Sequence, residues 1–186
     1  MILPIVAYGD PVLKKETEEI EKDYPFLSEL IDDMFETMYE ANGVGLAAPQ
    51  VGKSIRLFVV DASAFADDEP ALEGFKKVFI NPIIVDESGE KWTFNEGCLS
   101  IPGIREDVVR EPEIRLEYYD QNFELQEETF KGIAARIIQH EYDHIEGILF
   151  TDRINPLKRR LLKSKLTNIS KGNVAVDYKM KFPLVK

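Results

Sequence analysis

The chain has 186 residues, of which 44% are hydrophobic and 31% are charged, so we expect one folded domain over residues 1–186. Its single cysteine excludes an internal disulfide and favours a reducing, cytoplasmic location. The N-terminus lacks the basic lead and the small-residue cleavage site of a signal peptide, and no apolar run is long enough for a membrane helix. We therefore expect no membrane partner, and we expect any bound metal to serve function, because a core of this size needs no metal to fold.

The charge is unevenly distributed along the chain. Residues 153–186 hold ten Lys/Arg and one acid, Asp177, for a net charge of +9, whereas the preceding residues hold 13 basic and 33 acidic side chains, for a net charge of −20. This pattern predicts an acidic body with a basic C-terminal helix and tail. Such a segment could bind a polyanion.

The first half of the chain predicts one helix and two strands. Residues 24–42 place apolar side chains at spacings of three and four, which predicts an amphipathic N-terminal helix that ends at Gly43. Residues 55–61 and 77–84 are rich in β-branched and aromatic residues and are predicted strands. The acidic stretch 62–76 between them is a predicted loop.

The second half predicts a hairpin followed by helices. Residues 113–119 and 123–130 are two strands joined by a polar turn, and residues 131–146 form an apolar, central helix. Residues 155–169 are a predicted basic helix that begins near a proline, and the remaining tail is predicted to be irregular. The absence of alternating strands and helices favours an α+β fold with antiparallel sheets.

His140, Glu141 and His144 form an HExxH pattern in the central helix. Residues four apart lie on one face of a helix, so the two imidazoles can share one metal ion, with Glu141 beside them to move protons. Ile133 and Ile137 continue the same stripe, so the histidines would face an apolar site, where unpaired imidazoles are costly. We therefore predict a metal site and not two surface histidines.

The third ligand is best supplied by Cys98. No third histidine exists, Glu146 lies too close along the helix, and few acids follow. A lone cysteine is more often a small core residue, but a pair of histidines that lacks a partner favours its use as a ligand. Three ligands leave a position open for water, as in catalytic metal sites, where the pKa of the water falls toward about 7.

Residues 43–50, GVGLAAPQ, form a loop of small residues that would allow another chain to approach. Gln50 ends this loop with an amide that could donate to an oxyanion. The loop lacks the GxxxxGK[ST] pattern, so we exclude nucleotide binding here.

Three segments together resemble the signature motifs of the bacterial peptide deformylase family: GVGLAAPQ (43–50), EGCLS (96–100) and QHEYDH (139–144). The resemblance covers nearly the whole chain. It implies an α+β fold whose sheets pack around the central helix that carries the histidines. It also implies a hydrolase that removes the N-formyl group from the formyl-methionine of newly made proteins.

The resemblance implies a role for individual residues. Cys98, His140 and His144 would bind one divalent ion, usually Fe²⁺, with Zn²⁺, Ni²⁺ or Co²⁺ as substitutes, and Glu141 would be the general acid and base. The Gln50 side chain and the Leu99 N–H would stabilise the oxyanion. The remaining expected contacts are to substrate and come from the backbones of Val44, Gly45 and Gly97.

Three side chains are expected to border the substrate. Ile133 and Ile137 would line a shallow pocket for the methionine side chain. Arg105 could contact the substrate beyond its first residue, although a solvated arginine is an equally good interpretation.

Two other functions remain open from the residues themselves: an HExxH metallopeptidase that cuts internal peptide bonds, and a non-catalytic metal-binding interaction protein. The cysteine ligand and the narrow loop disfavour the first, and Glu141 beside an open metal position disfavours the second. The basic segment could dock the enzyme on ribosomal RNA, near its nascent substrates. Alternatively it is a solvated helix whose Leu157, Leu161 and Leu162 pack on the body.

Overall fold

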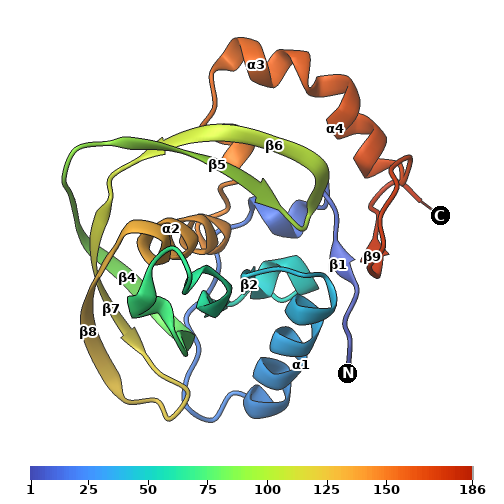
Figure 1. Cartoon of the computed structure of the whole chain (residues 1–186). Coiled ribbons are helices and arrows are strands. Elements are labelled where there is room, and N and C mark those ends of the chain that lie inside the picture. Colours follow the sequence, from blue (N-terminus) through green and yellow to red (C-terminus); the bar gives the residue numbers. More distant parts are fainter. Residues whose placement is uncertain (186) are drawn as a thin grey trace.

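The structure is a computed structural model that describes residues 1–185. Within these residues the strands form one five-stranded and two two-stranded sheets, and the helix that carries both histidines packs on the five-stranded sheet (Figure 1). The α-helices are α1 (Leu27–Glu40), α2 (Gly132–Ile145), α3 (Pro156–Leu161) and α4 (Lys163–Ser170). The strands are β1 (Ile5–Val6), β2 (Gly45–Ala47), β3 (Leu57–Asp61), β4 (Lys76–Ser88), β5 (Trp92–Cys98), β6 (Ile101–Arg110), β7 (Glu113–Tyr119), β8 (Leu125–Lys131) and β9 (Met180–Lys181). Antiparallel sheets and a few helices confirm the mixed, α+β character expected from the sequence.

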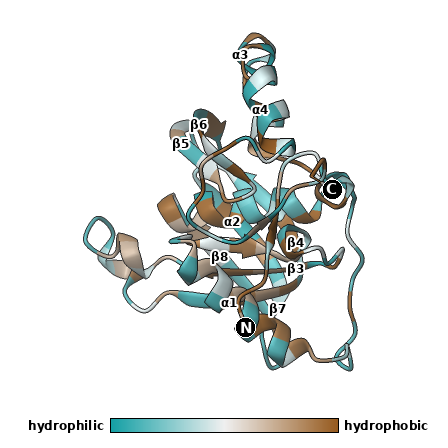
Figure 2. Cartoon of the chain, turned by 90° about the vertical axis from the view of Figure 1, so that its right-hand side faces the viewer, coloured by the Kyte–Doolittle hydropathy of each residue, from teal (hydrophilic) through white to brown (hydrophobic). Residues whose placement is uncertain are grey.

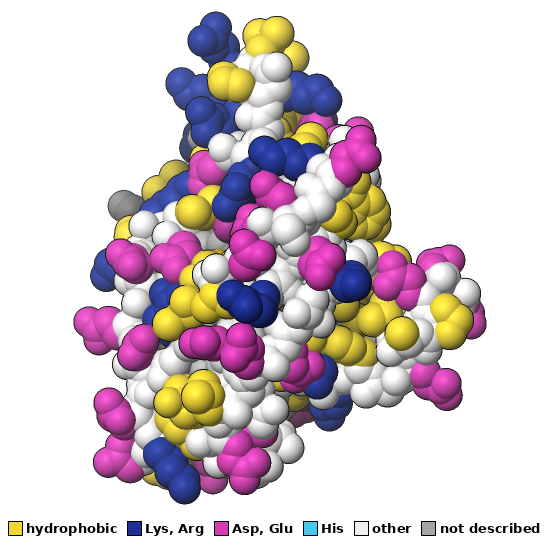
Figure 3. All heavy atoms as spheres, turned by 90° about the vertical axis from the view of Figure 1, so that its left-hand side faces the viewer, with side chains coloured by type: hydrophobic (Ala, Val, Ile, Leu, Met, Phe, Trp, Pro, Cys, Tyr) yellow, Lys and Arg dark blue, Asp and Glu magenta, His cyan; other side chains and the backbone are white. Residues whose placement is uncertain are grey.

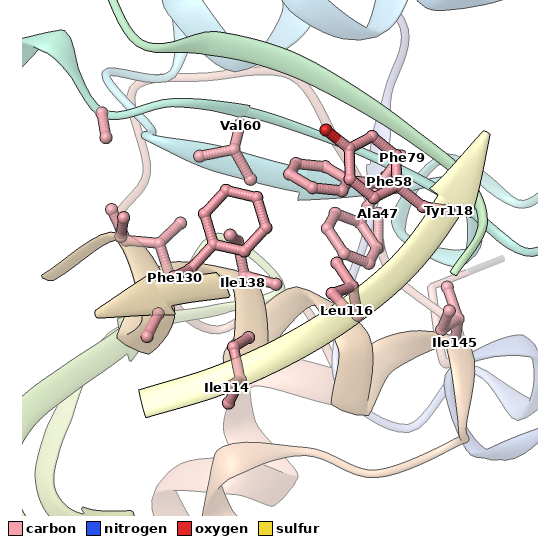
Figure 4. Close-up of a cluster of buried hydrophobic side chains, with 14 of the residues drawn as sticks. Ala47, Phe58, Val60, Phe79, Ile114, Leu116, Tyr118, Phe130, Ile138 and Ile145 are labelled. Atoms are coloured by element: carbon pink, nitrogen blue, oxygen red, sulfur yellow. The ribbon is translucent and has the colours of Figure 1, made fainter. Parts of the chain in front are cut away.

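The largest sheet has the antiparallel order β2-β3-β4-β7-β8 and is covered on both faces. Strand β3 shows why its sequence is apolar throughout. Phe58 and Val60 point into the cluster shared with α2, which Figure 4 shows, whereas Leu57 and Val59 point into the cluster shared with α1. All four side chains are fully buried, since successive residues of a strand face opposite sides.

Helix α2 begins at a glycine with positive φ, and another such glycine follows shortly after its end. Gly132 has a φ of +59°, and a Cβ there would lie 2.6 Å from a carboxylate oxygen of Glu69. That carboxylate accepts a hydrogen bond from the backbone N–H of Ile133, which satisfies one free donor at the start of the helix. Gly147, with a φ of +75°, follows the helix two residues after its end.

Strands β5 and β6 form a separate antiparallel hairpin that the sequence analysis did not predict. The hairpin turns at residues 99–100, directly after Cys98. Strand β5 is polar and mostly half-exposed, and β6 carries Pro102 and Gly103 near its start, so neither gives a clear strand pattern.

Helix α1 ends at Glu40, two residues before the predicted end at residue 42. Asn42, not Gly43, adopts the left-handed conformation, with a φ of +57°. Asparagine tolerates this conformation, and the Gly43 N–H then donates to the Met38 carbonyl. The predicted loop 62–76 contains two short 3-10 helices, Ser63–Phe65 and Pro70–Leu72.

The basic C-terminal segment differs from the single helix that was predicted. It forms two short helices, α3 and α4, and α3 projects from the body (Figures 1 and 2). Asn155 caps α3 through its side chain, and Pro156 occupies the first helical position. The expected packing of Leu157 and Leu161 on the body is wrong, because these side chains are 60% and 73% exposed.

The last described residues return to the body. Strand β9, in the tail that was predicted to be irregular, pairs in parallel with β1 (Figure 1). None of the helices within residues 1–185 has the length and apolar character needed to cross a bilayer.

Candidate metal centre and substrate cleft

Cys98, His140 and His144 lie together, with one potential ligand atom from each within 4.8 Å of the others. Cys98 is the last residue of β5, and the two histidines lie one turn apart on α2. The Cys98 Sγ is 3.3 Å from the His144 Nε2. The fold thus brings the hairpin tip to the histidine face of the central helix.

Glu96 orients the first histidine. Its Oε1 lies 3.0 Å from the His140 Nδ1, which leaves the Nε2 of the ring free to face a metal ion. Burial by itself would raise the pKa of Glu96, but hydrogen bonds from His140 and Arg110 hold it well below its usual value. The carboxylate is therefore charged and fixes the tautomer of His140.

Buried ion pairs extend from Glu96 to the rest of α2. Arg110 donates to both carboxylate oxygens of Glu96, at 2.8 and 3.0 Å, and to Asp143 at 2.8 Å. Arg136 donates to the same Glu96 at 2.8 Å, and Arg153 donates to Asp143. These contacts tie β5, β6 and α2 together directly behind the histidines.

Glu141 is buried beside the two histidines, with 4% of its surface exposed. Its Oε1 is 3.8 Å from the His140 Nε2, and its Oε2 is a buried atom with no hydrogen-bond partner within residues 1–185. Burial raises the pKa of this carboxyl group to about 7. Gly45 lies against it, since a Cβ at residue 45 would approach Oε1 to 3.1 Å and the Glu141 Cγ to 2.8 Å.

Gln50 is buried with its amide directed at the hairpin tip. Its Oε1 accepts a hydrogen bond from the Ala47 N–H at 3.0 Å, which fixes the orientation of the amide. Its Nε2 lies 3.2 Å from the Ser100 Oγ and 3.6 Å from the Cys98 Sγ. An N–H donor therefore faces the site.

A cleft of about 940 Å³ opens over these groups. Every site residue named from the sequence, except the deeply buried His144, borders it: Val44, Gly45, Gln50, Gly97, Cys98, Leu99, Arg105, Ile133, Ile137, His140 and Glu141. Ile133 and Ile137 also pack against the core between α2 and the large sheet. They can serve both the core and the cleft wall.

Arg105 is held on the cleft rim by Asn95. Its Nε donates to the Asn95 Oδ1 at 2.7 Å, and its Nη2 donates to the Asn95 carbonyl at 3.0 Å. The guanidinium lies so close to Gly97 that a Cβ there would be 2.7 Å from Nη1. The side chain is therefore held across the strand by hydrogen bonds, although it is exposed to solvent.

The donor set fits a cation. Burial lowers the pKa of His144 well below its usual value, so this imidazole is neutral and can act as a ligand. Burial alone would also lower the pKa of His140, but contacts with Cys98 and Glu96 raise it well above its usual value. The surroundings of His140, with Cys98 and Glu96 beside it, therefore favour positive charge, and a divalent metal ion would supply that charge. Thiolate and imidazole ligands suit Fe²⁺, Zn²⁺, Ni²⁺ and Co²⁺.

The sequence analysis assigned no role to Glu96, Ser100 or Tyr178. Glu96 precedes Cys98 by two residues on a strand, so recognising β5 would have placed both on one face. Ser100 and Tyr178 carry no local signal, because their partners lie 50 and 79 residues away.

Comparisons with known proteins point to one family. The model of a family described as polypeptide deformylase matches residues 2–160. Peptide deformylase from Christiangramia forsetii is 62% identical over 100% of this chain and 98% of its own length. Peptide deformylase from Flavobacterium johnsoniae is 58% identical with the same coverage.

Solved structures give the same result. The peptide deformylase of Thermus thermophilus matches with a TM-score of 0.82 and 40% identity, over 92% of this chain and 99% of that one. A Met-Ala-Ser-bound peptide deformylase from Acinetobacter baumannii matches with a TM-score of 0.75 and 37% identity, over 83% of this chain and 99% of that one.

Proposed function

This chain belongs to the polypeptide deformylase family and removes the N-formyl group from newly made polypeptides; we propose that Cys98, His140 and His144 hold its metal ion and that Glu141 moves the protons. The observation that carries this assignment is the convergence of one thiol and two imidazoles within 4.8 Å, beside a buried carboxyl group. Members of the family depend on a metal ion. We propose Fe²⁺ as the ion in this chain, with Zn²⁺, Ni²⁺ or Co²⁺ as substitutes, since the ligand set accepts all four.

When bound, the ion would lower the pKa of a coordinated water and polarise the formyl oxygen. Glu141 takes the proton of the attacking water and later gives it to the leaving amine. A pKa of about 7 suits a group that must both accept and donate near neutral pH. The products are formate and a free methionine amine.

Gln50 and Leu99 stabilise the negative charge that develops on the formyl oxygen. The Gln50 amide is fixed before substrate binds, because Ala47 holds its oxygen while its Nε2 faces the cleft. The Leu99 N–H lies at the hairpin tip beside Cys98. Donors that are already oriented need no reorganisation as the charge forms.

The substrate peptide lies between two strand edges. Strand β2 is the terminal strand of the large sheet, and within residues 1–185 β5 pairs only with β6, so each has an edge available for an added strand. The backbones of Val44, Gly45 and Gly97 provide these contacts, and Ile133 and Ile137 accept the methionine side chain. Arg105 contacts the peptide beyond its first residue. The Met-Ala-Ser complex of the Acinetobacter baumannii relative supports a peptide of this kind in the cleft.

The basic segment is a docking surface for the ribosome in this proposal. Lys158, Arg159 and Arg160 are exposed on the projecting α3. Figure 3 shows Lys and Arg side chains gathered at that end, whereas acidic side chains are scattered over the visible face of the body. RNA phosphates would attract this positive charge, whereas they would repel the acidic body and keep it out of contact with the RNA. Such docking places the enzyme beside nascent chains in the cytoplasm.

The experiment that tests the function is formate release from formyl-Met-Ala-Ser by protein prepared anaerobically with iron. An unformylated peptide that begins with Met-Ala-Ser and is extended at its C-terminus serves as the control substrate, because it offers internal peptide bonds but no formyl group. We expect formate from the first and no cleavage of the second. Cleavage of internal peptide bonds would instead indicate a metallopeptidase, and the absence of any turnover with a full complement of metal would indicate a binding protein.

A further inference from the structure

The C-terminal tail lies outside the region that the family model matches, yet it is built into the body. The match ends at residue 160, whereas β9 pairs with β1. The Ile5 N–H donates to the Lys179 carbonyl at 3.0 Å, and the Ala7 N–H donates to the Lys181 carbonyl at 2.9 Å. Val174, Met180 and Phe182 also pack on the core beside β6. The segment before β9 is therefore fixed at both ends.

This fixed segment forms part of the cleft wall. Residues 175–178 border the same cleft as Cys98 and Glu141. Tyr178 links this wall to the hairpin tip, because its hydroxyl donates a 2.7 Å hydrogen bond to the carbonyl of Leu99. The ring packs among apolar side chains of the cluster beneath α1.

The bonded carbonyl belongs to the turn on which the reaction depends. Leu99 and Ser100 form the tip of the β5-β6 hairpin, directly after Cys98. Three separate segments hold this tip: Tyr178 bonds the Leu99 carbonyl, the Tyr8 N–H donates to the Ser100 carbonyl at 2.9 Å, and Gln50 donates to the Ser100 Oγ. The Leu99 carbonyl shares a peptide plane with the Ser100 N–H, so the bond from Tyr178 holds that plane and limits the ψ rotation of Leu99. In so tight a turn this also limits the rotation of the preceding peptide plane, which carries the Leu99 N–H.

We propose that Tyr178 is a positioning residue for deformylation, which holds the hairpin tip so that the Leu99 N–H and the Cys98 thiolate keep their catalytic orientation. This inference rests on the proposed function, since it assigns the tip its role there. It extends the catalytic machinery to the tail, beyond the residues that the family model covers.

The test compares Tyr178→Phe with Tyr118→Phe in the full chain loaded with metal. Both changes remove one phenol hydroxyl and keep the ring; the hydroxyl of Tyr118 bonds Glu128, away from the cleft. Losing one neutral hydrogen bond should lower kcat for formyl-Met-Ala-Ser by about 3- to 10-fold in Tyr178→Phe, with KM within about twofold. Amide exchange of the peptide that spans residues 97–101 should be faster in this variant. Tyr118→Phe should match the wild type in both measurements.

Several results would overturn the proposal. A normal kcat in Tyr178→Phe would show that the hydroxyl only stabilises the tail, whatever happens to exchange. A change confined to KM would make the tail a substrate contact, and unchanged exchange at residues 97–101 would remove the link to the turn. Equal losses in both variants would show a general effect of hydroxyl removal. A wild-type protein without deformylase activity would instead contradict the proposed function itself.

Discussion

The Oε1 of Glu96 lies 3.0 Å from the Nδ1 of His140, and the same carboxylate accepts hydrogen bonds from Arg110 and Arg136. One buried group thus orients a metal ligand and forms ion pairs with two arginines. The ion pairs with the arginines also keep the carboxylate beside His140, because a carboxylate held by two guanidinium groups cannot rotate away from the ring.

Replacing Glu96 with Gln should therefore weaken metal binding and the fold together. We expect the metal dissociation constant to rise by about 10- to 100-fold, as is typical when the partner of a ligating histidine is lost. Losing the buried charge that pairs with Arg110 and Arg136 should cost about 3–5 kcal/mol of unfolding free energy, although Arg110 keeps its bond to Asp143. Chelator competition and urea unfolding measure the two effects.

The matched control for this change is Glu106→Gln. Glu106 is the cross-strand partner of Glu96 in the hairpin, and its nearest cation is Lys158, 3.7 Å away. The Glu106→Gln variant should bind metal with the wild-type dissociation constant. An unchanged dissociation constant in Glu96→Gln would show that His140 needs no orienting partner.

The identity of the ion predicts a difference in lifetime. The iron-loaded enzyme should lose activity in air faster than the nickel- or zinc-loaded enzyme, because Fe²⁺ can be oxidised and loss of the ion would expose the Cys98 thiolate. Residual deformylation, measured at intervals after anaerobic protein is exposed to air, follows this loss. Equal lifetimes for all metal forms would contradict the assignment of a redox-active ion.

Tyr39 gives a pH-dependent stability. Its hydroxyl lies 2.5 Å from the Asp61 Oδ2, and burial together with this bond raises the pKa of Tyr39 from 10.0 to about 12. The folded state therefore favours the protonated phenol. This stabilisation is full below about pH 10 and is lost as the pH rises through about 12.

Urea unfolding of the wild type and of Tyr39→Phe tests this. The difference in unfolding free energy between the two proteins should be constant near pH 9 and should shrink toward pH 12. A difference that stays constant over this range would show that the phenol has the same pKa in the folded and unfolded states.

The fold was predictable where one residue pattern decided the structure. The strand at 113–119 has the bounds of β7, since Ile114, Leu116 and Tyr118 alternate cleanly into the core. The predicted helices at 24–42 and 131–146 contain α1 and α2, with the ends shorter by one to three residues. The β5-β6 hairpin was missed, because a strand that lines a cleft carries polar residues on both faces.

The candidate site was predictable where the spacing itself carries the chemistry. Two histidines four residues apart on a helix must share a face, and the only cysteine was the natural third ligand. The groups that support this site come from distant segments, such as Arg110 and Tyr178. Their positions follow from sheet pairing and tail packing, which no local pattern encodes.

The basic segment that carries α3 is expected to bind ribosomes through its positive charge. Changing Lys158, Arg159, Arg160 and Lys163 to Glu should abolish co-sedimentation with ribosomes and leave turnover of formyl-Met-Ala-Ser intact. The wild-type affinity should fall steeply between low and physiological salt.

The matched control is a variant in which four exposed lysines of the body, and none of the basic segment, are changed to Glu. This variant should still co-sediment with ribosomes. These lysines are Lys15, Lys22, Lys53 and Lys91. A wild-type protein that fails to co-sediment even at low salt would show that α3 is not a ribosome-docking surface.

The most direct test of the site is the turnover of Glu141→Gln per bound metal ion. Gln keeps the size of the side chain but cannot carry the proton, so the variant should hold one metal ion per chain and lose at least about 10²-fold in formate release. Cys98→Ala, prepared in parallel, should lose most of the metal. Near-normal turnover by metal-loaded Glu141→Gln would contradict the account, because the proton would then move through another group.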